Sequence, residues 1–380
     1  MARAKLEALE RRRLRRELAV TERLDATHAQ RAADDQTLVS FSCNDYLGLS
    51  HHDEVVAAAI EATGRYGAGA GSSRLVNGNH PLYAELEHLL ARLKGTEDAV
   101  VFGSGYLTNI GVIPALVGHA DLIVMDELCH SCLLTGAELA RARIVKFRHN
   151  DAAHAAELLK QYRKEHRRAL LVTDGVFSME GDLAPLPALS ALAAEHDAWL
   201  LCDDAHGLGV VGGGRGSTFA FSPPPAVPLQ MGTLSKAVGA YGGYLCTSRS
   251  VAELVRNRAR SFVYSTGLPP ATVAAAIAAL KIIANDAALV SKPLERAAQF
   301  CGLLKLPPPQ SPIVPLVLGR ADVTLAASRA LASAGFLVAP IRPPTVPAGT
   351  SRLRFTFSAA HTPRQVRDLA AAVTALSRLA

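Results

Sequence analysis

A lysine held among small and hydroxyl residues is the most reactive side chain that the sequence suggests. Lys236 lies in Met231-Gly-Thr-Leu-Ser-Lys-Ala237, after an apolar run at 227–230. Thr233 and Ser235 place hydroxyl groups beside it. A lysine withdrawn from water loses pKa and can act as a nucleophile or form a Schiff base. A lysine extending from a surface loop would look the same locally, so the choice depends on the rest of the chain.

Five apolar runs earlier in the chain predict the strands of a sheet, and helical segments separate them. They span residues 99–102, 122–125, 144–147, 169–173 and 199–202. The runs are continuous rather than alternating, which is typical of parallel strands buried on both faces. We therefore predict an α/β fold whose mostly parallel open sheet is covered by helices. Ligands bind at the carboxyl edge of such sheets.

Polar residues follow these runs at that edge. Gly103-Ser-Gly105-Tyr106 is a Gly-rich turn that leads into a helix, and helix N-termini bind phosphate. Asp203 ends a buried strand, where a carboxylate needs a cation as partner. His130 could lie flat on a ring, although a histidine at a helix start is more often only structural.

The other strand-end residues complete a coherent set. Ser178 and His206 could reach the hydroxyl of a ring, and Thr233 could hold phosphate beside Lys236. These residues would together provide a phosphate-binding turn, an imidazole that stacks on a ring, an anion that pairs with a pyridinium, and an amine. This combination matches a site for pyridoxal 5′-phosphate held by Lys236 as a Schiff base.

One glycine pattern matches a binding site for a different cofactor, but the residues that follow it do not fit such a site. Gly207-Leu-Gly-Val-Val-Gly212 follows a strand and matches the dinucleotide-binding pattern. That pattern must open a helix, but Gly213-Gly-Arg-Gly216 comes next. We therefore do not expect a nicotinamide or flavin site.

The six cysteines predict free thiols. Cys129 and Cys132 form a C-x-x-C pair, but a zinc site would need a second pair at matching spacing. We expect no metal, and a redox pair stays open as the alternative.

The chain divides by pattern into three parts. Residues 1–45 form an arm with a helix at 3–18 and a short strand at 39–43, and residues 46–285 form the large cofactor-binding α/β domain. Residues 286–380 form a small α+β domain. Its expected strands are 313–317, 337–340 and 353–357, and its helices are 321–334 and 363–378.

Charge and hydropathy exclude several classes of protein. The net charge is +6, and residues 1–18 hold +4 of it, so the rest of the chain is near neutral. This argues against nucleic-acid binding, although a basic arm that binds nucleic acid is the alternative from another class. No apolar run reaches the length of a membrane span, and no signal core is present. We expect a cytoplasmic protein.

Several motifs together carry a family resemblance. Asp203-Asp-Ala-His206 precedes Thr233-Leu-Ser-Lys236, and further matching segments occur in the same order. These are Ser42–Gly48, Gly78–His80, Ser104–Tyr106, Asp174–Gly181, Ser265–Thr266, Pro344–Pro347 and Arg352–Arg354. Over nearly its whole length the chain resembles the α-oxoamine synthases, which are fold-type I pyridoxal-phosphate enzymes. The resemblance implies a PLP-dependent acyltransferase.

The resemblance also implies a role for each site residue. Lys236 would carry the cofactor and remove the Cα proton, Asp203 would pair with the pyridine nitrogen, and His130 would stack on the ring. Thr266 would reach the phosphate from a second subunit, which implies a homodimer with its active site at the interface. The implied cofactor-binding residues are Gly105, Tyr106, His130, Ser178, Asp203, His206, Thr233, Lys236 and Thr266.

Substrate choice is implied in the same way. The match is best to the subgroup that condenses L-alanine with a pimeloyl thioester in biotin biosynthesis. Arg354 would hold the amino-acid carboxylate, and Ser73 would leave room for the alanine methyl group. Thr345 would border the acyl chain, beside His130. Arg15 would meet the distal acyl carboxylate, or it is simply one more exposed arginine.

Besides the nucleic-acid-binding alternative, two enzymatic alternatives stay open. A sister synthase would use glycine and an acetyl thioester, and an aminotransferase of the same fold would release neither carbon dioxide nor thiol. In the main interpretation, the sequence also leaves open whether coenzyme A or a carrier protein carries the acyl group.

Overall fold

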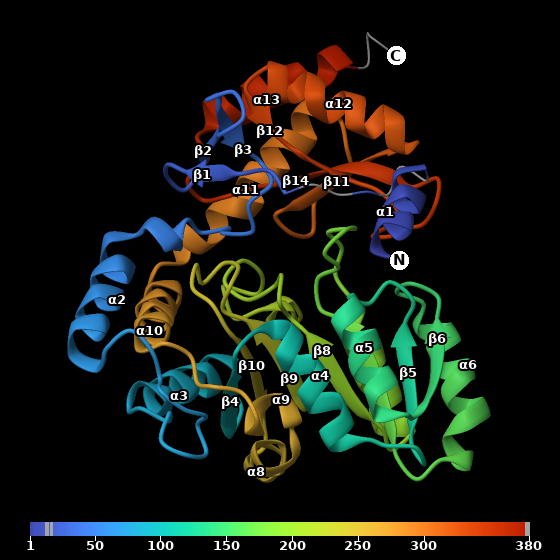
Figure 1. Ribbon diagram of the computed structural model, residues 1–380. Helices are drawn as coiled ribbons and strands as arrows, with labels where there is room; N and C mark the ends of the chain where they lie inside the picture. The colour runs from blue at the N-terminus through green and yellow to red at the C-terminus, as the bar shows by residue number, and fades with distance from the viewer. Residues whose placement is uncertain (12–14, 16–17, 377–380) are drawn as a thin grey trace.

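The computed structural model describes residues 1–11, 15 and 18–376. Figure 1 shows two stacked layers of structure, with the strands of the central sheet in the lower one. That sheet has seven strands in the order β4-β10-β9-β8-β7-β5-β6. Its strands are β4 (Asp98–Phe102), β5 (Leu122–Asp126), β6 (Arg143–Phe147), β7 (Ala169–Asp174), β8 (Trp199–Asp203), β9 (Leu229–Thr233) and β10 (Gly243–Thr247).

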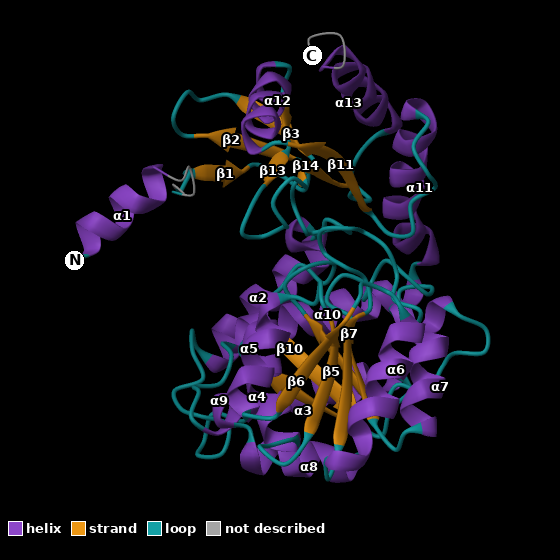
Figure 2. Cartoon of the chain, turned by 90° about the vertical axis from the view of Figure 1, so that its right-hand side faces the viewer, coloured by secondary structure: helices purple, strands orange, loops and turns teal. Residues whose placement is uncertain are grey.

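Helices cover both faces of this sheet, as Figure 2 shows. The side chains of Val100 and Phe102 pack with α4 (Gly105–Leu116), α5 (Ser131–Ala140) and α8 (Arg249–Arg258). Alternate residues such as Ala99 and Val101 face the opposite side. That side is covered by α2 (Asp53–Tyr66), α3 (Leu82–Lys94), α10 (Pro270–Asn285), α6 (Ala152–Tyr162) and α7 (Leu186–Glu195). Burial on both faces explains why the strands have continuous apolar sequences.

The expectation of a mostly parallel sheet is confirmed, with one strand that the pattern did not reveal. β10 pairs antiparallel with both β4 and β9. Its sequence, Gly-Tyr-Leu-Cys-Thr, follows a glycine-rich turn and contains a single strongly apolar aliphatic residue. The turn brings the chain directly back beside β9, so no crossover helix marks the strand.

A second group of elements lies above the large sheet. β11 (Ile313–Gly319), β14 (Ser351–Thr356) and β13 (Ala339–Ile341) form an antiparallel sheet. The helices α11 (Ala287–Leu304), α12 (Ala321–Ser333) and α13 (Pro363–Leu376) pack nearby. α11 contains Pro293 and was not expected from the sequence. α9 (Arg260–Val263) is a single turn in the lower layer.

The chain's first strands join this upper group. β1 (Thr21–Arg23), β2 (His28–Arg31) and β3 (Thr37–Ser40) form a sheet with β12 (Phe336–Leu337), which runs parallel to β3. The expected strand at 337–340 was therefore wrong, because Val338 separates two strands that belong to different sheets. The expected strand at 39–43 ends at Ser40, where the chain leaves the sheet.

The first helix, α1, spans Ala2–Arg11 and projects from the rest of the chain (Figure 2). The expected helix at 3–18 extends beyond it, but residues 12–14 and 16–17 lie outside the described chain. Among the described residues, no single helix is long and apolar enough to cross a membrane. α10 and α11 pass that test only as a pair, with an 82° bend between them.

Candidate active site

The sequence-predicted residues converge on one cavity at the carboxyl edge of the large sheet. The cavity has a volume of ≈ 170 Å³. Eight of its lining residues were expected at a cofactor site: Gly105, Tyr106, His130, Ser178, Asp203, His206, Thr233 and Lys236. A larger hollow of ≈ 1010 Å³ between α3, α7 and the Pro-rich segment 224–228 contains none of the expected site residues. The reactive groups, rather than cavity size, identify the site.

Lys236 follows β9 in a turn that its hydroxyl neighbours stabilise. The Thr233 hydroxyl donates to the Gly242 carbonyl oxygen at 2.7 Å and accepts from the Ser235 amide at 3.2 Å. The turn directs Lys236 into the cavity, where burial lowers the pKa of its ammonium group, although the nearby Asp203 opposes the shift. A lowered pKa favours the free amine, which is the form that reacts with an aldehyde or accepts a proton.

Asp203 ends β8 and is 4% exposed. Its Oδ2 accepts a hydrogen bond from Asn109 Nδ2 at 2.7 Å, and its Oδ1 accepts from the Ala205 amide at 3.0 Å. Asn109 is on α4 and its Oδ1 has no hydrogen-bond partner among the described residues. The two donors hold the carboxylate at a fixed orientation.

His130 caps α5 and lines the cavity at the same time. Its backbone N–H donates to Asp174 Oδ2 at 3.2 Å, and its Nδ1 accepts from the Cys132 amide at 3.3 Å. Burial lowers the pKa of His130, although the charge of Asp203 opposes the shift, and this favours the neutral form of the ring. Burial, reinforced by the charge of Asp203, raises the pKa of Asp174 well above its usual value.

His206 is linked to the upper group of elements through a tyrosine. The Tyr46 hydroxyl lies 2.6 Å from His206 Nδ1, and both side chains are buried. Burial lowers the pKa of His206 well below its usual value, and the positive charge of Lys236 lowers it further. A neutral imidazole at this position can hydrogen-bond to a ring oxygen without adding charge.

Arg354, on β14, is a buried cation that hydrogen-bonds to neutral groups of the described chain. Nε donates to the Ser178 carbonyl oxygen at 2.5 Å, Nη1 to Asn44 Oδ1 at 3.2 Å and Nη2 to the Tyr46 hydroxyl at 3.4 Å. No carboxylate among the described residues lies within 4.0 Å of its guanidinium, whereas Arg352 on the same strand pairs with Glu180 at 2.8 Å. A buried charge without a counter-ion is costly, so this guanidinium suits an anionic ligand.

The residues present fit the expected pyridoxal phosphate. The N-terminus of α4 faces the cavity, and Gly105 keeps it close to Met231 and Thr233, whose atoms would lie 3.2 and 3.4 Å from an added Cβ. A helix N-terminus suits the phosphate, and the Asp203 carboxylate suits a protonated ring nitrogen. The amine of Lys236 suits the aldehyde.

Comparison with known proteins agrees with the cofactor expected at this site. A family model described as aminotransferase class I and II matches residues 36–373. The 8-amino-7-oxononanoate synthase of Methylocella silvestris is 60% identical over 342 residues, which cover 90% of this chain and 97% of that protein. The chain belongs to the α-oxoamine synthase family.

Two further relatives cover almost the whole of this α-oxoamine synthase. A putative 8-amino-7-oxononanoate synthase of Parvibaculum lavamentivorans is 59% identical over 373 residues, or 98% of this chain and 95% of that protein. A serine palmitoyltransferase from S. paucimobilis, described with a bound PLP–myriocin aldimine, has a TM-score of 0.93 and 30% identity, covering 100% of this chain and 97% of that one. The fold is therefore that of the fold-type I PLP-dependent transferases, as expected.

Five expected site residues do not line the cavity. Ser73 and Thr266 pair with each other in an isolated β-bridge, and Thr345 is exposed in the loop before β14. Arg15 pairs with Glu10 at 3.1 Å on the surface, and Arg354 lies behind Ser178. The structure thus brings together the residues expected to bind the cofactor, except Thr266, and leaves most of those expected to select the substrates apart.

Sequence reasoning missed the residues that support the site from behind. Asn109 lies four residues after Gly105 on α4, so helical spacing places both on one face, and that signal could have found it. Tyr46 and Asn44 lie within Ser42–Gly48, which was noted only as a matching motif. Their contacts to Arg354 depend on tertiary structure.

The glycine pattern at 207–212 opens no helix in the described chain, as expected. Gly207 of this pattern and Gly216 just after it instead pack against Asp204: an added Cβ at either position would collide with that carboxylate. Asp204 pairs with Lys94 Nζ at 2.6 Å and accepts from the Ser217 amide. This glycine-rich segment therefore helps to enclose the buried Lys94–Asp204 ion pair and has a structural role.

Proposed function

We propose that this chain catalyses the decarboxylative condensation of L-alanine with a pimeloyl thioester. The products are 8-amino-7-oxononanoate, carbon dioxide and a free thiol, as in biotin biosynthesis. The observation that carries the proposal is the 60% identity, over 97% of its length, to a protein named 8-amino-7-oxononanoate synthase. The cavity supports it, because it presents an amine, a carboxylate and a helix N-terminus together.

Pyridoxal 5′-phosphate is the proposed cofactor, and when bound it supplies an electron-accepting ring that stabilises negative charge at the amino-acid α-carbon. Lys236 would hold it, and Asp203 would face its ring nitrogen. The first turn of α4 (Gly105 and Tyr106) and Thr233 would bind its phosphate, and His130 would lie against its ring.

Lys236 is the proposed base. Its lowered pKa lets Nζ take the proton from the α-carbon and return it later in the reaction. Arg354 is the proposed carboxylate-binding residue, because its buried guanidinium has only neutral partners among the described contacts. His206 and Ser178 would contact ring substituents, and the low pKa of His206 keeps its imidazole neutral.

The assignments beyond the cavity belong to the same proposal. Ser73, Thr345 and Arg15 would contact the alanine methyl group, the acyl chain and the distal acyl carboxylate. Thr266 would complete the phosphate site of a second copy in a cytoplasmic homodimer. We also propose a division into an arm (1–45), a large domain (46–285) and a small domain (286–380).

One set of assays tests the function. Purified protein with pyridoxal phosphate is given L-alanine, glycine or L-serine, each with pimeloyl, acetyl or palmitoyl thioester, and free thiol and carbon dioxide are measured. We expect the highest kcat/KM with L-alanine and pimeloyl thioester, and no turnover by Lys236→Ala. Preference for glycine with the acetyl thioester would assign a sister activity, and amino transfer without thiol release would contradict the proposal.

A further inference from the structure

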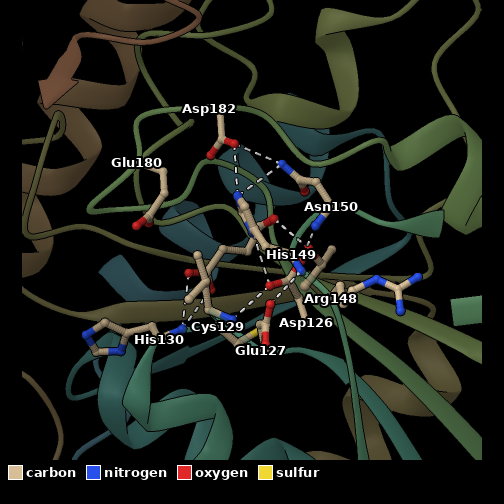
Figure 3. A network of polar contacts seen from close by, with 12 residues as sticks. Asp126, Glu127, Cys129, His130, Arg148, His149, Asn150, Glu180 and Asp182 are labelled. Atoms are coloured by element: carbon tan, nitrogen blue, oxygen red, sulfur yellow. Dashed lines mark hydrogen bonds and ion pairs between the residues drawn. The ribbon is translucent and has the colours of Figure 1, made fainter. Parts of the chain in front are cut away.

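His149 lies outside the cavity and is held between two carboxylates. It follows β6, and its Nδ1 is 3.2 Å from Asp126 Oδ1 while its Nε2 is 2.9 Å from Asp182 Oδ2 (Figure 3). The ring of Phe177 packs edge-on against it, with centroids 4.4 Å apart. A neutral imidazole has one N–H and can donate to only one of two carboxylates, so this geometry favours the imidazolium.

The charges around His149 agree with that protonation state. Burial alone would lower the pKa of His149, but the hydrogen bonds and charges of Asp126 and Asp182 outweigh it and raise the pKa to about 10. Asn150 also links the two aspartates, because its amide N–H donates to Asp126 Oδ2 at 2.7 Å and its Nδ2 donates to Asp182 Oδ2 at 3.0 Å and lies 3.4 Å from His149 Nε2. Glu127 accepts from the His149 amide at 3.1 Å. In the part of the chain that the structure describes, no second cation pairs with either aspartate.

Asp126 shapes the turn that presents His130. It ends β5, its side chain is buried, and its Oδ1 accepts from the Leu128 amide at 2.8 Å. Its carbonyl oxygen accepts from the Cys129 amide at 3.2 Å, immediately before His130. The Asp126 carboxylate therefore accepts hydrogen bonds both from the turn before His130 and from His149.

Asp182 anchors the loop that follows β7. Its carbonyl oxygen accepts from the Phe177 amide at 3.0 Å, which closes the loop around Ser178. The Ser178 carbonyl oxygen accepts from Arg354 Nε at 2.5 Å, and Glu180 pairs with an arginine of β14 at 2.8 Å. This loop is thus the support of the guanidinium that we assign to the substrate carboxylate.

We propose that His149 is a positioning residue: it ties the turn that presents His130 to the loop that supports Arg354. It thereby fixes where the amino-acid carboxylate binds relative to the cofactor ring. The inference rests on the proposed function, because that function gives Arg354 its ligand. Without the imidazolium, Asp126 and Asp182 would face each other as like charges, and the link through Asn150 would have to hold the loop around Ser178 against their repulsion.

The test measures amino-acid binding separately from turnover. L-Alanine is titrated into the cofactor-loaded enzyme without acyl thioester, and Kd is taken from the change in cofactor absorbance. We expect His149→Gln to raise this Kd about tenfold, or about 1.4 kcal/mol. The exposed His88 provides the matched control, and His88→Gln should leave Kd unchanged.

A second variant guards against misfolding. The Asp182 side chain is 33% exposed, so Asp182→Asn should fold, and we expect it to raise Kd several-fold. Because both changes break one link, the double variant should bind no more weakly than His149→Gln alone. An unchanged Kd in either single variant would overturn the proposal, even if the thermal midpoint falls. So would a double variant in which the increases in Kd from the two single changes multiply.

Failure of the proposed function gives a different result. Wild-type enzyme that binds an amino acid but does not condense L-alanine with the pimeloyl thioester disproves the function alone. The titration is then repeated with glycine or L-serine, and the same comparison of variants decides the role of His149.

Discussion

Replacing Lys94 by methionine should strongly destabilise the protein, because it breaks an ion pair that water does not reach. Lys94 is at the end of α3 and its side chain is 0% exposed, while that of Asp204 is 1% exposed. Nζ donates to Asp204 Oδ2 at 2.6 Å and to the Arg215 carbonyl oxygen at 2.7 Å. Methionine fills similar space but leaves the carboxylate buried without its cation.

The size of the effect follows from that burial. Removing one partner of a buried pair costs about 3–5 kcal/mol, because the remaining charge is uncompensated. The Ser217 amide still donates to Asp204, so we expect the lower part of this range. The double variant Lys94→Met with Asp204→Asn also removes the remaining charge, so its free energy of unfolding should be at least about 1 kcal/mol higher than that of Lys94→Met alone.

Urea unfolding at fixed protein and cofactor concentrations measures the change. Lys281→Met is the matched control, because Lys281 pairs with Glu85 at 2.8 Å but the two side chains are 55% and 46% exposed. Breaking that pair should cost less than about 1 kcal/mol. The reasoning is refuted if Lys94→Met costs no more than Lys281→Met, or if the double variant is less stable than Lys94→Met alone.

Three further outcomes are expected. Arg354→Lys should raise Kd for L-alanine about 10–100-fold and abolish the preference over L-alanine methyl ester, since hydrogen bonds to charged groups contribute about 1.5–3 kcal/mol; an equal effect on acid and ester would contradict this. Asn109→Ala should lower kcat about tenfold by freeing Asp203, which single-turnover rates can check. Burial lowers the pKa of His361 to about 4. The neutral ring therefore contributes fully to stability above about pH 6.5, and this contribution falls by about 2 kcal/mol between pH 7 and 5 and is lost as the pH approaches 4. Urea midpoints of wild type and His361→Gln at pH 7 and pH 5 measure the loss.

The sequence predicted those parts of the fold that leave a strong apolar signal. Strands buried on both faces, such as β5 and β8, have continuous apolar runs, and their final residues mark the site edge. β10 and α11 leave weaker signals: the strand follows a glycine-rich turn without a crossover, and the helix contains Pro293. Periodicity alone could not place the two short strands around Val338 in separate sheets.

The site was predictable for a similar reason and to a similar extent. Side chains that face the cavity lie at strand ends, so residues such as Asp203 and Lys236 can be found one motif at a time. The residues that orient them depend on contacts between distant segments. Tyr46 meets Arg354 across 308 positions of sequence, and His149 meets Asp182 across 33. No local pattern encodes such a pair.

The parallel pairing of β3 with β12 has a consequence for how the chain folds during synthesis. Gln36 reaches the carbonyl of Ala332 across 296 positions, so the first strands wait for their partner until most of the chain has been made. At about 5–20 residues per second, the wait is roughly 15–60 s. Every strand of the large sheet emerges within that interval. The oldest segment of the nascent chain is therefore among the last to acquire its native neighbours, and for that time it is available to chaperones.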